Sequence, residues 1–410
     1  MLCLGHTVKK QVATILFRKN MTTKQNYFLS QPHQPFFLLG IANAIVMMLL
    51  FALSYKGIFT LSIDTTAFHV YSLAYLVFSN VFTGFLFTTF PRFNQTEVIE
   101  KRYYTNIFYT NLAGSVLFVL GAFTTPLLSV ASMLILFIAE IFTVMQLQKI
   151  FNNGRTPDKT DSLWILVANY FGIVGHLLFI AATLFGFYML IPTAVNITFY
   201  LYLIFLAFSV GQRMIPFFSH SWAEKNPNFI KITFGLFILK TLFTSADIKL
   251  AELLVDLLLA FFMLREFLRW DLHPLQSPSI LWVLHLALFW LPTAFGLSAV
   301  SLAAALFLDT SFYFLNIHLL AIGFLTTVLI GFGTRVTLGH AGMPPQADNF
   351  VTGLFIWIQA IVLFRSLFSL NIAFGWEANF LFDISFTAWI LLFLLWGGRY
   401  AKILIFANDQ

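Results

Sequence analysis

Long apolar stretches, most of them about twenty residues long, alternate with short polar segments along almost the whole chain. An apolar stretch of this length can cross the hydrocarbon core of a bilayer as a helix. Inside lipid every backbone polar group needs an internal partner, which favours helices over an open sheet. The pattern therefore predicts an all-α integral membrane protein, a bundle of about 12 transmembrane helices. We expect them at residues 36–54, 68–90, 104–123, 127–149, 163–186, 189–212, 229–245, 249–269, 279–304, 311–336, 349–370 and 378–402.

Basic residues are distributed unequally between the two sets of loops that join these helices. One set holds nearly all of the loop lysines and arginines, whereas the opposite set holds essentially Lys56 and Lys249. Positively charged loops stay on the cytoplasmic side, so both termini are expected in the cytoplasm. The predicted organisation is a basic cytoplasmic segment at 1–30 and a single twelve-helix transmembrane domain at 31–410.

Composition narrows the classes of protein that remain. The chain has 410 residues, of which 59% are hydrophobic and 10% are charged, with a net charge of +6. Soluble domains carry roughly 25% charged residues. No basic stripe suggests nucleic-acid binding, and the positive charge is explained by the cytoplasmic loops. A single cysteine, Cys3, excludes an intrachain disulfide and a cysteine-based iron–sulfur or zinc site within the chain.

Histidines in or against the membrane are the first candidates for functional residues. An ionisable side chain in or against the membrane is energetically expensive and therefore a functional candidate, although a neutral histidine bonded to a nearby carbonyl is the simpler alternative. His69 and His318 are the strongest candidates, and His176 is the weakest. The six histidines in this position are His33, His69, His176, His285, His318 and His340.

The second and tenth helices share a layout. Both are expected to enter from the outer side, with a histidine in the outer half and an arginine at the inner end. Arg92 follows His69 at a helical distance of about 34 Å, and Arg335 follows His318 at about 25 Å. Two histidines at similar depth on different helices suit the two axial positions of one haem iron.

A second group of polar residues is expected at the inner face. The stretch "IGFGTRVTLGHAGMPP", residues 330–345, places Arg335 and His340 among four glycines. We expect a structured loop after residue 336 that holds these side chains toward an anion, a haem propionate or a metal. The alternative is an arginine that only anchors the helix at the interface. The layer is also expected to include His33 and Arg213, with His285 two turns deeper.

Several of these segments resemble the NnrS family of bacterial membrane proteins. "GTRVTLGHAGMPP" is similar to its motif of Arg, two variable residues, Leu-Gly-His and a proline. "HQPFFLLG" resembles the family's opening, "GQRMIPFF" resembles its Gly-Gly-Arg-Val-Ile-Pro-Phe-Phe, and "LWVLHLALFWLP" resembles its Leu-His helix. "FHVYSLAYLVFSNVFTGFLFTTFPRF" resembles its second helix, although many members have His-Ala-His-Glu-Met where this chain has "FHVYSL".

The resemblance implies a twelve-helix protein that contains haem and copper and is linked to nitric oxide and nitrosative stress. The resemblance also implies a set of candidate functional residues: His33, His69, Arg213, His285, His318, Arg335 and His340. A more distant likeness is the catalytic subunit of haem–copper oxidases. However, Asn316 stands where that enzyme needs a second histidine, and the sixth and seventh helices contain none. A standard oxidase of that type is therefore not expected.

These observations predict a haem-binding, and also copper-binding, protein of the bacterial cytoplasmic (inner) membrane that acts in the response to nitric oxide. Haem b would be held by His69 and His318, with Arg213, Arg335, His33 and His340 also contacting a cofactor. His33, His285 and His340 are further metal-ligand candidates, and nitric oxide or an electron donor is the expected partner. The alternative is a membrane transporter or metal-handling protein with an anion site on its basic cytoplasmic side.

Overall fold

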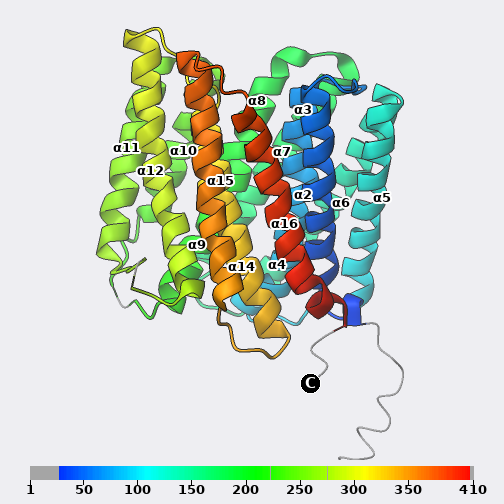
Figure 1. Cartoon of the computed structure of the whole chain (residues 1–410). Coiled ribbons are helices and arrows are strands. Elements are labelled where there is room, and N and C mark those ends of the chain that lie inside the picture. Colours follow the sequence, from blue (N-terminus) through cyan, green and yellow to red (C-terminus); the bar gives the residue numbers. More distant parts are fainter. Residues whose placement is uncertain (1–26, 222, 275, 407–410) are drawn as a thin grey trace, which may run out of the picture.

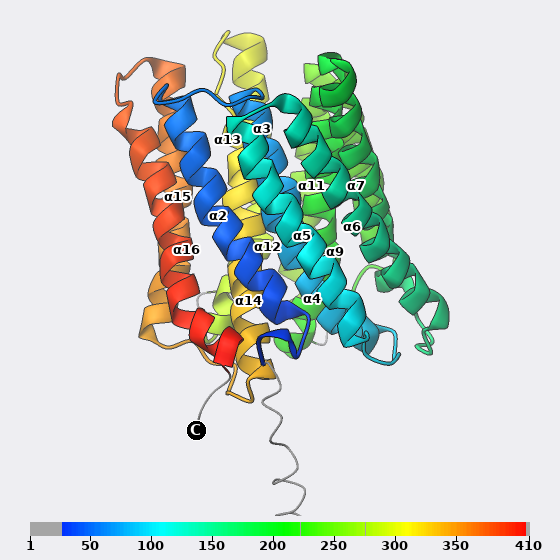
Figure 2. The same cartoon turned by 90° about the vertical axis from the view of Figure 1, so that its right-hand side faces the viewer.

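The computed structural model describes residues 27–221, 223–274 and 276–406, and within them it is all-helical and contains no strand. Twelve helices are present, which confirms the predicted fold class. They run side by side between two ends of one bundle (Figures 1 and 2). After a short turn at Tyr27–Leu29, the helices are α2 (His33–Tyr55), the α3–α4 helix (Thr65–Phe93), α5 (Lys101–Phe123), α6 (Pro126–Asn153), α7 (Thr160–Phe185), the α8–α9 helix (Tyr188–Phe218), α10 (Phe229–Ser245), α11 (Lys249–Arg269), α12 (Ser279–Phe307), the α13–α14 helix (Leu315–His340), α15 (Asn349–Phe374) and α16 (Phe380–Phe406).

Three helices, which we call the central helices, form the middle of the bundle: α3–α4, α8–α9 and α13–α14. Their most apolar stretches are 83%, 61% and 72% buried, against 39–56% in the other seven helices that are long and apolar enough to span a membrane. Each central helix is the second of four consecutive helices. The first helix of each group packs along it: α2, α7 and α12.

Each central helix contains a π-helical segment, at Ser72–Phe78, Ile197–Ile204 and Leu319–Thr326. These segments separate α3 (Thr65–Tyr71) from α4 (Ser79–Phe93), α8 (Ile191–Asn196) from α9 (Phe205–Phe218), and α13 (Leu315–His318) from α14 (Thr327–His340). The middle segment contacts both of the others. π-Helical turns are rare and frequently mark functional sites. Two of the three begin just after a candidate histidine, His69 or His318.

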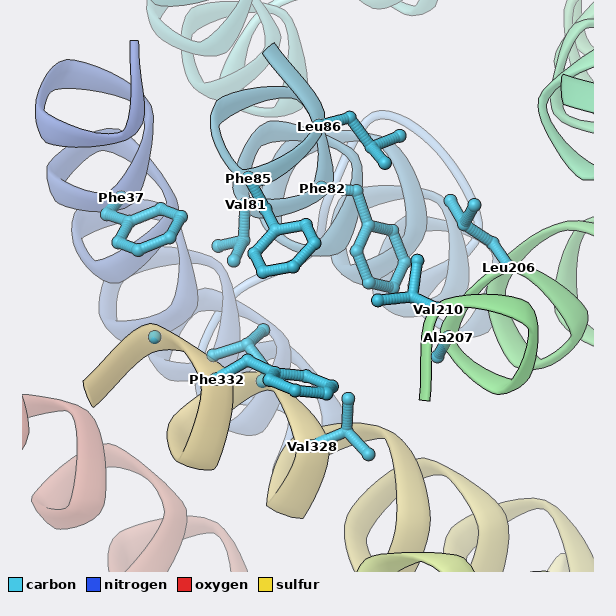
Figure 3. Close-up of a pocket in the computed structure, with 12 residues that line it drawn as sticks. Phe37, Val81, Phe82, Phe85, Leu86, Leu206, Ala207, Val210, Val328 and Phe332 are labelled. Atoms are coloured by element: carbon cyan, nitrogen blue, oxygen red, sulfur yellow. The ribbon is translucent and has the colours of Figure 1, made fainter. Parts of the chain in front are cut away.

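A small apolar cavity of about 20 Å³ lies where the central helices meet. Figure 3 shows Phe82 and Phe85 of α4, Val210 of α9 and Phe332 of α14 converging on it, with Phe37 of α2 at its edge. On the α3–α4 helix the residues that line the cavity lie between His69 and Arg92 in the sequence. On the α13–α14 helix they lie between His318 and Arg335. An apolar layer therefore separates the two predicted polar layers.

Helices α10 and α11 are the two that are not long and apolar enough by themselves to span a membrane. The buried ammonium of Lys240 on α10 lies 2.7 Å from a carboxylate oxygen of Glu252 and 2.7 Å from one of Asp256, both on α11. Ser298 of α12 donates a hydrogen bond of 2.6 Å to Asp256. All three charged groups are at most 7% exposed. Mutual pairing is what makes charged residues tolerable at this depth.

The prediction that a loop begins after residue 336 is wrong. The α13–α14 helix continues to His340 and ends at Ala341, followed by Gly342 with φ of +71°. The earlier glycines serve helix packing. A Cβ on Gly331 would lie 2.7 Å from the Leu284 side chain, and one on Gly333 would lie 2.9 Å from Trp396. They bring α14 close to α12 and α16.

Candidate functional site

The structure brings four of the candidate histidines together as two pairs. We call the end of the bundle that holds α3 and α13 the outer end, and the end where α4 and α14 stop the inner end, after the predicted topology (Figure 1). His69 and His318 form the outer pair. His33 and His340 form the inner pair. Members of each pair are far apart in the sequence and come from different helices.

The outer pair has two nearly parallel rings. The ring centroids of His69 and His318 are 6.5 Å apart, with 16° between the ring planes. Phe51 of α2 stacks on His69 at 3.9 Å. That separation leaves room for one metal ion bound to a nitrogen of each ring, since such bonds are about 2.0–2.1 Å long.

The hydrogen bonds of the outer pair leave one nitrogen of each ring available to bind a ligand. The Nδ1 of His318 donates to the carbonyl oxygen of Phe314 at 2.8 Å, so the other nitrogen of a neutral ring carries a free lone pair. The Nδ1 of His69 is buried and has no partner among the described residues. Buried polar atoms are nearly always paired. The outer pair therefore has unfilled capacity for binding.

Arg365 of α15 is an outer-site residue that the sequence analysis missed. Its side chain is 8% exposed, it donates to Ser369 at 2.6 Å, and its charge acts on both His69 and His318. It forms no ion pair with any acidic residue in the described part of the chain. A buried cation without a counter-ion is expensive and suits an anionic ligand group. The available signal was a lone arginine well inside an apolar helix.

The inner pair is closer together. The ring centroids of His33 and His340 are 4.8 Å apart, with 49° between the planes. His33 is 1% exposed, and the Nδ1 of His340 donates to the Val336 carbonyl at 3.0 Å. Within the part of the chain that the structure describes, His33 Nδ1 and the buried His340 Nε2 have no partner. The charge of Arg92 acts on both rings. Two free ring nitrogens thus face a basic environment.

Close helix packing positions His33. Gly84 of α4 has no side chain, and a Cβ there would lie 2.7 Å from the Cβ of Phe36 and 3.2 Å from the Cα of His33. The backbone N–H of His33 donates to the Thr88 hydroxyl at 3.2 Å. The sequence analysis placed His33 just before the first helix, whereas it is the first residue of α2.

The other three inner candidates have partners of their own. The guanidinium of Arg335 lies 3.9 Å from the centre of the Phe218 ring. Arg213 pairs with Asp161 at 3.1 Å and lies over Phe93. The ring nitrogens of His285 bond to Ser219 at 2.6 Å and to Ser277 at 3.4 Å. Their membership of the inner layer therefore stays a prediction.

Neither pair has a third protein ligand of the usual kind. Across residues 27–221, 223–274 and 276–406, no group of three or more His, Cys, Asp or Glu side chains could hold a metal ion. Haem supplies four ligands of its own and needs one or two from the protein. The donor set of the outer pair therefore fits haem better than it fits a bare ion.

Comparison with known proteins agrees with the sequence resemblance. The model of the family described as NnrS protein matches residues 27–407, nearly the whole chain. No curated protein matches the sequence. The match includes every histidine of both pairs and all twelve helices. The chain therefore belongs to the NnrS family, and this membership indicates a nitric oxide-related membrane protein.

Proposed function

We propose that this protein binds haem between His69 and His318 and acts through that haem in the response to nitric oxide. The observation that carries the proposal is the outer pair itself: two parallel rings 6.5 Å apart, from two central helices, each with an available nitrogen. A haem held by these two histidines would supply one-electron transfer. Arg365 would pair with a haem propionate, which gives its buried charge a counter-ion. An electron donor is the partner that this chemistry requires.

The central cavity supports a role with a small uncharged gas. Its lining is apolar, and its volume of about 20 Å³ is comparable to the space that one small molecule needs. Nitric oxide is neutral and diatomic, so it can enter apolar space without the desolvation cost of an ion. The cavity lies between the outer and inner pairs and shares Phe37 with the surroundings of His33.

The experiment that tests the proposal is a haem analysis of the full-length protein purified in detergent from a bacterial host. We expect a Soret band, a sharp reduced α band typical of six-coordinate haem, and haem b in a pyridine-haemochrome assay. Addition of nitric oxide to the reduced protein should change this spectrum. Colourless protein from a haem-replete host would exclude the proposal.

We further propose that the inner pair holds copper, because imidazole nitrogen is a preferred copper ligand. His33→Ala and His340→Ala should each lower the copper content at least about tenfold, since even outer-shell changes weaken metal sites roughly 10–100-fold. The measurement is copper per protein by mass spectrometry after dialysis against a weak chelator. His273→Ala, which alters an exposed loop histidine, is the matched control. Equal copper in all variants would place any copper elsewhere.

The proposed location is the bacterial cytoplasmic membrane with both termini in the cytoplasm. A reporter fused after Gln410 should show cytoplasmic activity, whereas one inserted between Tyr55 and Thr66 should report the outside. The physical reason is the excess of basic residues in the loops on the side of the termini. The opposite pattern would exchange the outer and inner ends of the bundle without changing the composition of either pair.

A further inference from the structure

A third polar cluster, which includes neither histidine pair, lies between α6, α7 and the α3–α4 helix. The ring of His176 is 1% exposed and both of its nitrogens are occupied. Its Nδ1 is 2.6 Å from Glu140 Oε2, and its Nε2 is 2.7 Å from the Tyr71 hydroxyl. Tyr75 stacks on the same ring at 4.0 Å. Three residues from α6 and the α3–α4 helix thus hold the imidazole of α7 in a single orientation.

The second carboxylate oxygen of Glu140 faces a polar cavity. Glu140 Oε1 is buried and has no partner among the described residues. The cavity has a volume of about 20 Å³, and its polar lining includes Ser79, Asn111, Thr143 and Asn169. A polar space of this size holds one water, which would then find several hydrogen-bond partners. The free oxygen is therefore positioned to contact water inside the bundle.

Two glycines of α7 keep this space open. A Cβ on Gly172 would lie 2.8 Å from Glu140 Oε1, and a Cβ on Gly175 would collide with the Thr198 hydroxyl. Tyr75 donates to the Gly172 carbonyl oxygen at 3.2 Å and bonds to Thr198 at 2.7 Å. Any larger residue at Gly172 would press on the free oxygen of Glu140. The local sequence thus preserves contact between the carboxylate and the cavity.

Among the described residues, His176 is the basic side chain that pairs with Glu140. The cavity lining contains no lysine or arginine within the described part of the chain. The remaining titratable groups around the pair are Tyr75 and Tyr202, which line the cavity, and Tyr71, which bonds to His176. An isolated carboxylate is costly in a low-dielectric interior, and sharing a proton with an imidazole reduces that cost.

We propose that Glu140 and His176 together form a proton-exchange site inside the membrane bundle. The site takes one proton from a hydronium in the polar cavity and later returns it to water there. On uptake an O–H bond of the hydronium breaks and an O–H bond forms at Glu140 Oε1, which leaves one water. The neutral carboxyl keeps its contact with the imidazole, because its Oε2 still accepts from the N–H at His176 Nδ1. No electron is transferred, and the site requires neither haem nor copper.

One residue of this site is close in sequence to the outer pair. Tyr71, which holds the His176 ring, is two residues after His69 on α3. Their side chains face different neighbours, Tyr71 toward α7 and His69 toward Phe51 of α2. A proton held here would therefore balance a change of charge at the outer site without contact between the two. The proposal thus adds proton exchange to the proposed electron transfer.

Infrared difference spectroscopy tests the proposal on the full chain in lipid nanodiscs. Spectra recorded between about pH 4 and pH 9, a range that spans ordinary carboxyl and imidazole titration, should show a buried carboxyl C=O band. The band should shift in D₂O and change together with a histidine ring band. Glu140→Gln should remove both changes. Glu97→Gln, which removes an exposed carboxylate, should leave both in place.

The competing explanation is a fixed ion pair that only joins the three helices. In that case the wild type would show no pH-dependent buried carboxyl band, and this single result overturns the proposal even if Glu140→Gln does not fold. Tyr71→Phe provides a second check, because it keeps both exchanging groups. It should shift the midpoint of the change while retaining the bands. Bands that are retained in Glu140→Gln would also overturn the proposal.

Discussion

Purified His69→Ala and His318→Ala proteins are expected to lose the low-spin haem spectrum, with haem content at least about tenfold lower than in the wild type. Even outer-shell changes weaken a metal site roughly 10–100-fold, and here a proposed axial ligand is removed. The two ring centroids lie 6.5 Å apart, so a nitrogen of each ring is within reach of one metal ion. The measurement is absorbance of the reduced protein together with a pyridine-haemochrome assay.

Arg365 provides a graded variant of the same experiment. Arg365→Met leaves both histidines and should weaken haem binding roughly 10–150-fold, since a hydrogen bond to a charged group contributes about 1.5–3 kcal/mol. Arg365→Lys keeps the charge and should lose less, although lysine cannot form the forked contact. His273→Ala is the control. Unchanged spectra in both histidine variants would disprove the axial assignment.

Lys240→Met is expected to lower the free energy of unfolding by about 3–5 kcal/mol, because it leaves two buried carboxylates without their cation. Glu252 and Asp256 are 7% and 0% exposed, so water cannot replace the lost ammonium. The measurement is equilibrium unfolding in mixed detergent micelles. Lys249→Met is the matched control, since Lys249 is exposed at the start of α11.

Charge removal distinguishes lost pairing from lost packing. The triple variant Lys240→Met, Glu252→Gln, Asp256→Asn removes all three charges and should recover most of the stability, because neutral amides do not need a counter-ion. If Lys240→Met is as stable as Lys249→Met, the three groups are not charged together in the folded protein. If the triple variant remains as unstable as Lys240→Met, packing around the lysine stem is the main contribution.

The length of each helix and the depth of a residue along it could be predicted from the sequence. Both depend on local properties. Apolar length identified all twelve helices, including α10 and α11, which have charged residues in their interior. Helix rise placed His69 and His318 at matched depth, and the structure brings them together. Five motifs between residues 31 and 345, taken together, resembled the NnrS family, and the family model matches residues 27–407.

Which side chains meet could not be predicted, because it depends on the face that each helix turns toward its neighbours. A helix that is apolar all round has no polar side to indicate that face. For this reason the contacts of Arg213 with Asp161, of Arg335 with Phe218 and of His285 with Ser219 were not predicted. The end of α14 was misplaced because glycine reads as a turn residue, while Gly331 and Gly333 allow close helix contact.

The sequence by itself determined a twelve-helix membrane protein, its family and the depth of its polar residues, since apolar length and helical rise act along one chain segment at a time. Only the tertiary structure decided the partners of those residues. It united His33 with His340, placed Arg365 beside the outer pair, and enclosed His176 between Glu140 and Tyr71. Each of these contacts joins residues at least 36 positions apart, so it depends on helix packing rather than on local sequence.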